Sequence, residues 1–164
     1  MPENIETVTL DATDLRILDL LQTDASLTNQ ALAEAVHTSP ATCLRRVKRL
    51  REAGVIEAVV ALLAPQRLGA GLTAIVEVTL DRQGAEHLAA FEARAVAEAA
   101  VQQVYRVSPG PDFVLVLQVA DMPAYHALVQ ALFTQDANVR NLKAFFSVHR
   151  AKFAPRVSLP AGAA

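Results

Sequence analysis

One short stretch of the chain, residues 39–54, concentrates positive charge on a single predicted helix. Five of the seven residues that begin at Arg45 are basic, although the 164-residue protein carries a formal net charge of −2. Ser39 is a typical N-cap, Pro40 suits the first helical position, and Gly54 can adopt the left-handed conformation that ends a helix. These end signals constrain the stretch to one helix. Its concentration of cations favours a polyanionic partner.

The residues of this helix divide between two faces at about 100° per residue. The apolar ones fall on one side and are expected to pack inward: Cys43, Leu44, Val47 and Leu50. Arg45 and Arg49 lie one turn apart on the opposite side, as in a helix that lies in a DNA major groove. The residues predicted to contact DNA are Thr38, Ser39, Thr42, Arg45, Arg46, Lys48 and Arg49. The alternative is a solvated amphipathic helix.

Two shorter helices are predicted before the basic one. Asp11 can N-cap the first, with Asp14 three residues later. Thr28 begins the second, whose inward residues are expected to be Leu32, Ala33 and Val36. His37 occupies the following tight turn, and histidine tolerates a left-handed backbone better than most residues. Helix, short helix, turn and basic helix is the helix-turn-helix arrangement, whose last helix reads DNA.

The segment after the basic helix marks the end of this N-terminal domain. Residues 55–63 are apolar and β-branched and predict a short strand, as in a small wing. Residues 64–71 carry turn formers and predict a linker. The sequence thus predicts a DNA-binding domain at residues 1–63, a linker at 64–71, a second domain at 72–152 and a C-terminal tail at 153–164.

The second domain is predicted to be ferredoxin-like, so the chain as a whole belongs to the α+β class. Hydrophobic periods predict strands at 72–80, 101–107, 113–119 and 139–149, and helices at 83–99 and 121–133. The order β-α-β-β-α-β places one antiparallel sheet under two helices on the same face. The other face is expected to mediate homo-oligomerisation through Val76, Val78, Val114, Val116, Phe146 and Val148. The tail is expected to be loose at its end.

Composition argues against several classes of protein. Cys43 is the single cysteine, which precludes an internal disulfide and favours a reducing compartment. No apolar run approaches membrane-spanning length and no signal peptide is visible, so a cytoplasmic location is predicted. The four histidines share no metal-ligand spacing. Gly69 and Gly71 precede a predicted strand, whereas a dinucleotide fingerprint opens a helix. No metal, cofactor or enzymatic activity is predicted.

Several motifs occur together in one order. They are Leu-Asp-x-x-Asp-x-x-Ile-Leu at residues 10–18, Ser-Pro-x-x-Cys-Leu-x-Arg-Val-x-Arg-Leu at 39–50, Gly-Val-Ile at 54–56 and Val-x-Asp-Met-x-x-Tyr at 119–125. From about Leu10 to Lys152 the chain therefore resembles the feast/famine, or leucine-responsive/asparagine-responsive (Lrp/AsnC), transcriptional regulators. The resemblance implies dimers built through the C-terminal sheets, often assembled into octamers. It also implies a small-molecule effector, commonly an amino acid, held in the C-terminal domains between neighbouring subunits.

The expected effector loop departs from the family pattern. Members typically carry Gly-x-x-Asp between the second and third strands, and here Pro109 stands where that glycine usually lies. Asp112 could accept from an ammonium group, and Ser108 and the Gly110 amide could donate to a carboxylate. The candidate effector-binding residues are Ser108, Gly110, Asp112 and Asn138, the last standing where relatives often carry a Pro-Gly turn. The alternative is that Asp112 only ties down a turn.

Taken together, these patterns predict a sequence-specific DNA-binding transcriptional regulator, modulated by an amino acid or a related small molecule. Its expected partners are double-stranded DNA, the effector and further copies of itself, as a dimer or an octamer. Two alternatives remain open. One is a stand-alone, oligomeric small-molecule-binding protein with no DNA role, which would have no need of the basic helix. The other is a small oxygenase-like enzyme.

Overall fold

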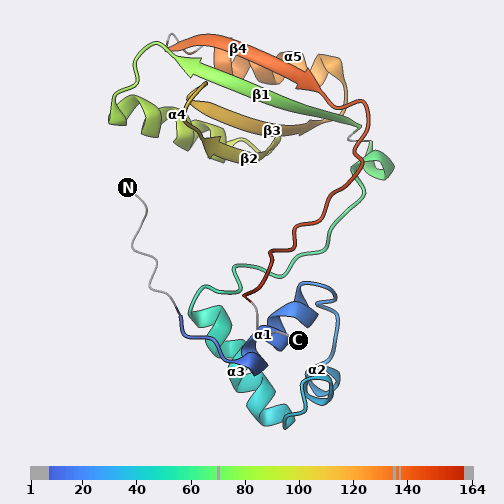
Figure 1. The fold of residues 1–164 in the computed structure, drawn as a ribbon. Helices are drawn as coiled ribbons and strands as arrows, with labels where there is room; N and C mark the ends of the chain where they lie inside the picture. The colour runs from blue at the N-terminus through green and yellow to red at the C-terminus, as the bar shows by residue number, and fades with distance from the viewer. Residues whose placement is uncertain (1–7, 70, 135, 137, 161–164) are drawn as a thin grey trace. The chain divides into compact units, whose positions relative to one another are not determined.

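The computed structural model describes residues 8–69, 71–134, 136 and 138–160, and the chain forms two compact units (Figure 1). The first combines the chain up to Leu62 with residues from Phe153 onward, and the second runs from Leu63 to Lys152. The chain therefore leaves the first unit and later returns to it. Within the described residues, no helix has the length and apolar character needed to span a bilayer.

Three helices build the first unit: α1 (Ala12–Leu21), α2 (Asn29–Ala35) and α3 (Pro40–Glu52). All three begin at the predicted N-caps, because each cap side chain accepts a hydrogen bond from a backbone N–H of the first turn. At α1 the cap is reciprocal. The Asp11 carboxylate accepts from the Asp14 N–H at 2.9 Å, and the Asp14 carboxylate accepts from the Asp11 N–H at 3.2 Å.

The helix-turn-helix arrangement is confirmed, including the left-handed backbone at its turns. His37 has a φ of 54° in the turn before α3, and Gly54 has a φ of 68° just after α3 ends. The buried side chains form one small core of Ile17, Leu18, Leu32, Ala33, Val36, Cys43 and Leu50. The inward assignment of Leu44 is wrong, since this residue is 60% exposed. It lies about 100° around the helix from Cys43, beyond the edge of the face that packs.

The strand predicted at residues 55–63 is also wrong. These residues adopt no strand, because a strand needs a hydrogen-bonded partner and no other described segment pairs with them. Val55 and Ile56 instead pack against the core of the first unit. A short 3-10 helix, η1 (Pro65–Leu68), follows within the predicted linker, where Gly69 has a φ of 75°.

The second unit has the predicted β-α-β-β-α-β order (Figure 1). Its elements are β1 (Leu72–Leu80), α4 (Ala85–Ala97), β2 (Val101–Arg106), β3 (Phe113–Val119), α5 (Met122–Val129) and β4 (Val139–Phe146). The strands form one antiparallel sheet in the order β2-β3-β1-β4. The second predicted helix is shorter than expected, because a π-helical turn, η2 (Gln130–Thr134), follows α5. The fourth strand ends at Phe146 rather than at His149.

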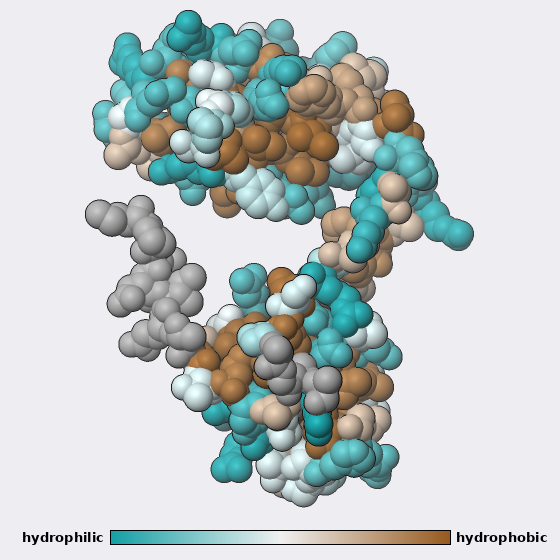
Figure 2. All heavy atoms as spheres, in the orientation of Figure 1, coloured by the Kyte–Doolittle hydropathy of each residue, from teal (hydrophilic) through white to brown (hydrophobic). Residues whose placement is uncertain are grey.

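The sheet buries one face under α4 and α5, and no helix of the described second unit covers the other face. The helix-covered core includes Val76 and Val78, which are fully buried, so their assignment to the bare face is wrong. Phe146 packs edge-on against Tyr125 of α5, and Val148 lies beyond β4. Strand register confirms Val114 and Val116 on the open face and adds Ile75, Tyr105 and Phe145 to it. Apolar and hydrophilic side chains mix on the surface of this unit (Figure 2).

The C-terminal tail belongs to the first unit, and its described residues, 153–160, contact that unit. Arg156 pairs with Asp19 of α1 at 3.0 Å. The Gln22 side chain exchanges two hydrogen bonds with the backbone of Val157, each 3.1 Å long. Leu159 packs against the core of the first unit. The tail therefore gains backbone and apolar partners that sequence composition does not reveal, while residues 161–164 lie outside the described part.

Candidate nucleic-acid interface and effector loop

The outward face of α3 presents exposed cations. Arg45 is exposed and, among the described residues, has no carboxylate partner within ion-pair distance. Lys48 is also exposed and lies 3.6 Å from Glu52, one turn later on the same helix. At the start of the helix, Ser39 donates from its hydroxyl to the half-buried Thr42 hydroxyl at 2.9 Å. The outward face of α3 therefore combines hydroxyl groups with exposed positive charge, as a DNA-contacting helix requires.

Two further arginines of α3 bind the beginning of α1. Arg46 donates from Nη1 to Asp11 at 2.6 Å and to Asp14 at 2.9 Å. Arg49 donates from Nη2 to the other carboxylate oxygen of Asp14. Only 1% of the Asp14 side chain is exposed, against 26% for Arg46 and 50% for Arg49. Both arginines were predicted to contact DNA, but the structure gives Arg46 a largely internal role and leaves half of the Arg49 side chain accessible.

The charges in this cluster reinforce one another. The Asp14 N–H and the Arg46 guanidinium lower the pKa of Asp11, and the carboxylates of Asp11 and Asp14 raise the pKa of Arg46. An open cavity of about 250 Å³ lies beside the cluster and is lined by Asp11, Arg45, Arg46 and Arg49. The sequence contains both halves of this cluster, but only packing shows that they meet.

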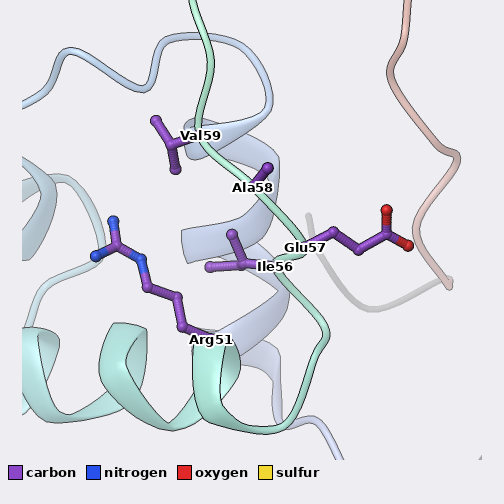
Figure 3. Close-up of a pocket in the computed structure, with 5 residues that line it drawn as sticks. All are labelled: Arg51, Ile56, Glu57, Ala58 and Val59. Atoms are coloured by element: carbon purple, nitrogen blue, oxygen red, sulfur yellow. The ribbon is translucent and has the colours of Figure 1, made fainter. Parts of the chain in front are cut away.

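A second cavity of about 360 Å³ lies at the C-terminal end of α3. It is lined by Arg51 and by residues 56–59. In Figure 3, Arg51, Ile56 and Val59 project to the same side of the chain, whereas Glu57 projects the other way. This cavity brings the last basic residue of α3 beside an apolar segment. It lacks the convergent polar groups that a small-molecule site would need.

Cys43 lies on the inward face of α3 and is fully buried. Burial raises the pKa of its thiol, which keeps the thiol protonated and therefore weakly nucleophilic near neutral pH. Its environment is that of a packing residue rather than of a catalytic nucleophile.

Two of the candidate effector residues, Asp112 and Asn138, converge on the end of β1. The Asp112 carboxylate accepts from the Leu80 N–H at 2.7 Å and from the Gln83 side chain at 3.2 Å, both on Oδ2. Asn138 accepts from the Arg82 N–H at 2.8 Å and donates to the Arg82 carbonyl at 3.2 Å. The two residues thus hold neighbouring parts of one loop, and the turn-forming role of Asp112 is present in the structure.

The other two candidate effector residues lie on the exposed part of the loop between β2 and β3. Ser108 and Gly110 are both exposed, and Gly110 has a φ of 127°, which favours glycine. Among the described residues, no group of three or more His, Cys, Asp or Glu side chains is arranged to hold a metal ion. The candidate effector residues therefore offer the Ser108 hydroxyl, the Gly110 amide, the Asp112 carboxylate and the Asn138 carboxamide.

A three-helix unit with a basic third helix, joined to a ferredoxin-like unit, defines the class of two-domain helix-turn-helix regulators. Comparison with known protein families supports this assignment. A winged helix-turn-helix DNA-binding family matches residues 10–57, and the Lrp/AsnC ligand binding domain matches residues 73–157. The chain belongs to the Lrp/AsnC family, and it is a DNA-binding transcriptional regulator rather than an enzyme.

Individual relatives span nearly the whole chain. The leucine-responsive regulatory protein of Rhizobium meliloti is 37% identical over 152 residues, covering 93% of this chain and 97% of that protein. The DNA-binding transcriptional activator DecR of Escherichia coli is 33% identical and covers 92% and 98%. The crystal structure of a transcriptional regulator from Neisseria meningitidis in complex with L-Met aligns with a TM-score of 0.84, at 32% identity and coverage of 93% and 97%.

Proposed function

We propose that the protein binds operator DNA as a homo-oligomer through the outward face of α3, and that an amino acid bound by the second unit modulates this binding. The observation that carries the DNA part is the exposed guanidinium of Arg45, which has no acidic partner among the described residues. An unpaired surface cation can exchange water and counterions for a phosphate or a guanine edge without breaking an internal contact.

The open face of the sheet supports the oligomer. Ile75, Tyr105 and Phe145 are 42%, 52% and 44% exposed, although each is a large apolar or aromatic residue. Val114 and Val116 lie between them. Such a face is stabilised when a second copy covers it. Two-fold pairing would also place two DNA-binding units against the two half-sites of an operator.

The loop at the end of β1 supports an effector site that is completed from elsewhere. Asp112 retains a second carboxylate oxygen, Oδ1, that accepts no hydrogen bond from the described chain and could accept from an ammonium group. Pro109 and Pro111 offer no N–H, so the loop is poor in donors for the carboxylate of an amino acid. Donors from a neighbouring subunit would meet this need.

Binding of the purified protein to the DNA upstream of its own gene tests the proposal. Fluorescence anisotropy would be measured over a range of salt concentrations, with a shuffled duplex of equal length as the control. We expect tighter binding to the upstream DNA and a decrease in affinity with salt. Leucine and methionine are the first effectors to add, followed by the other amino acids, and one should change the affinity about fivefold or more.

Two results would contradict the proposal. Equal binding to the upstream and shuffled duplexes would remove the sequence-specific role at this site. An affinity that no amino acid alters, together with no calorimetric heat of amino-acid binding, would remove the effector role while leaving the DNA-binding role in place.

A further inference from the structure

We infer that Asp14 is a positioning residue for DNA recognition: its buried carboxylate orients the guanidinium of Arg49, so that sequence preference depends on a residue that cannot reach DNA. The inference rests on the proposed DNA contact of α3. It also assigns a separate role to each of three arginines of α3. Arg45 acts without an internal partner, Arg49 acts in an orientation set by Asp14, and Arg46 fastens α3 to α1.

The contacts of Asp14 use both carboxylate oxygens. Oδ1 accepts from Arg46 at 2.9 Å, while Oδ2 accepts from Arg49 and, at 3.2 Å, from the Asp11 N–H. A carboxylate that is 1% exposed would be strongly unfavourable without such partners. Asp14 is therefore fixed in place by its burial, its backbone contact and Arg46, and it presents a rigid acceptor to Arg49.

Arg49 is suited to face two partners at once. Half of its side chain is exposed, and its contact with Asp14 uses Nη2. A guanidinium is planar and carries five N–H donors, so a bond on one edge fixes the direction of the others. A side chain that is already oriented loses less rotational freedom when it binds a base edge. This orientation sharpens the choice of base more than it strengthens attraction to phosphates.

Arg46 differs from Arg49 in its ion-pair partners and in its exposure. Its Nη1 bridges Asp11 and Asp14, and its Nε is buried with no hydrogen-bond acceptor in the described chain. Its side chain is three-quarters covered, since 26% is exposed. Arg46 therefore serves as the second cation that makes burial of Asp14 tolerable, rather than as a reader of bases.

The test compares base preference rather than affinity alone. A preferred site would first be selected from a random duplex library with the wild-type protein, and affinities would then be measured for every single-base change in that site. Asp14→Asn keeps the shape and an acceptor oxygen but removes the charge. We expect it to lose about tenfold in discrimination at the positions where Arg49→Ala loses discrimination, and to keep its affinity for a shuffled duplex.

Two controls separate positioning from a loss of folding. Asp11→Asn also weakens a contact of Arg46 but does not touch Arg49, so its base preferences should remain those of the wild type. The double variant Asp14→Asn, Arg49→Ala should discriminate no worse than Arg49→Ala alone, because both changes remove one coupled interaction. If Asp14→Asn does not fold, Arg49→Lys tests the guanidinium that Asp14 is inferred to orient. It keeps the charge but loses the two-sided fork, so its discrimination should fall at the same positions while the salt dependence is retained.

The inference and the proposed function fail in different ways. A wild-type protein with no selected site would contradict the proposed function. A wild type with a clear site would overturn the inference alone if a folded Asp14→Asn kept full discrimination, or if Arg49→Lys read the site as the wild type does. Loss of affinity spread evenly over all positions would also overturn it.

Discussion

The proposed DNA-contacting helix α3 and the candidate effector loop use their polar side chains in opposite ways. On α3, Arg45 is exposed and has no acidic partner among the described residues. In the second unit, Asp112 and Asn138 already bind the backbone around the end of β1. Removing a polar group from its internal hydrogen bonds costs free energy, whereas an exposed cation loses only its contacts with water when it binds a partner. The difference supports the proposal of a DNA surface that exists before binding and of an effector site that further groups must complete.

The largest effect is expected from removing the outward cations of α3. Arg45→Ala and Arg49→Ala should each weaken specific binding by about 1–3 kcal/mol if the arginine binds a base edge, because a bidentate contact is lost. If the contact is to phosphate, affinity should fall for all duplexes and the salt slope should decrease by about one unit.

Fluorescence anisotropy with specific and shuffled duplexes distinguishes these cases. Arg67→Ala, an exposed arginine of η1, is the matched control and should bind as the wild type does. Unchanged affinity in the double variant would show that α3 is not the DNA-binding helix.

A charge on the open sheet face should dissociate the proposed oligomer. Phe145→Asp places a carboxylate opposite Ile75, and burying it between two copies should cost about 2 kcal/mol or more. Sedimentation equilibrium of the full chain would measure this change as weaker self-association. Val148→Asp, which alters a fully exposed apolar residue beyond β4, should have little effect. Equal self-association of the two variants would place the interface elsewhere.

Neutralising Asp112 should separate effector binding from DNA binding. Asp112→Asn keeps an acceptor for the Leu80 N–H but removes the charge that could hold an ammonium group. We expect amino-acid binding in calorimetry to be lost, basal DNA binding to be kept, and unfolding stability to fall by about 1 kcal/mol or less. Gln83→Ala removes the other hydrogen bond to Asp112 and should retain the response. An amino-acid affinity that Asp112→Asn leaves unchanged would restrict Asp112 to its turn-forming role.

Loss of the tail contact should weaken the first unit modestly. Gln22→Ala removes two hydrogen bonds to the Val157 backbone, which at this exposed site should lower the free energy of unfolding by about 0.5–1 kcal/mol. Urea unfolding followed by circular dichroism would measure it. Gln30→Ala, on the exposed face of α2, should cost less because Gln30 binds only the side chain of Glu34. If both variants have the same free energy of unfolding, the tail does not stabilise the first unit.

The smallest effect concerns the charge at the start of α1. The pKa of Asp11 is lowered in the folded protein, so its charge stabilises the fold above the unfolded pKa of about 3.9, and this contribution is lost as pH falls through the lower folded value. Asp11→Asn keeps a good N-cap and should cost about 0.3 kcal/mol at pH 7, since solvent screens this half-exposed pair. Urea titrations at pH 7 and pH 3 should show the difference shrinking at low pH.

Local signals in the sequence were enough for most of the elements. Ser39, Thr28 and Asp11 cap the helices as predicted, and His37 and Gly54 take the left-handed backbone at the turns. These features depend on hydrogen bonds and sterics within about four residues, so the residue types define them wherever the chain folds. The period of apolar residues likewise predicted the β-α-β-β-α-β order, because strands and helices repeat at different intervals.

Tertiary packing decided the features that depend on distant partners. Asp14 binds arginines 32 and 35 residues later in the chain, and this separates the roles of Arg46 and Arg49. Strand register, rather than composition, placed Val76 under the helices and Phe145 on the open face. The apolar segment after α3 has no strand partner among the described residues. The C-terminal tail, in contrast, binds Asp19 of α1 and Gln22 just after it. These contacts depend on which surfaces meet in the folded chain. Residues that are far apart in the sequence come together only through tertiary packing, so local sequence patterns do not reveal such contacts.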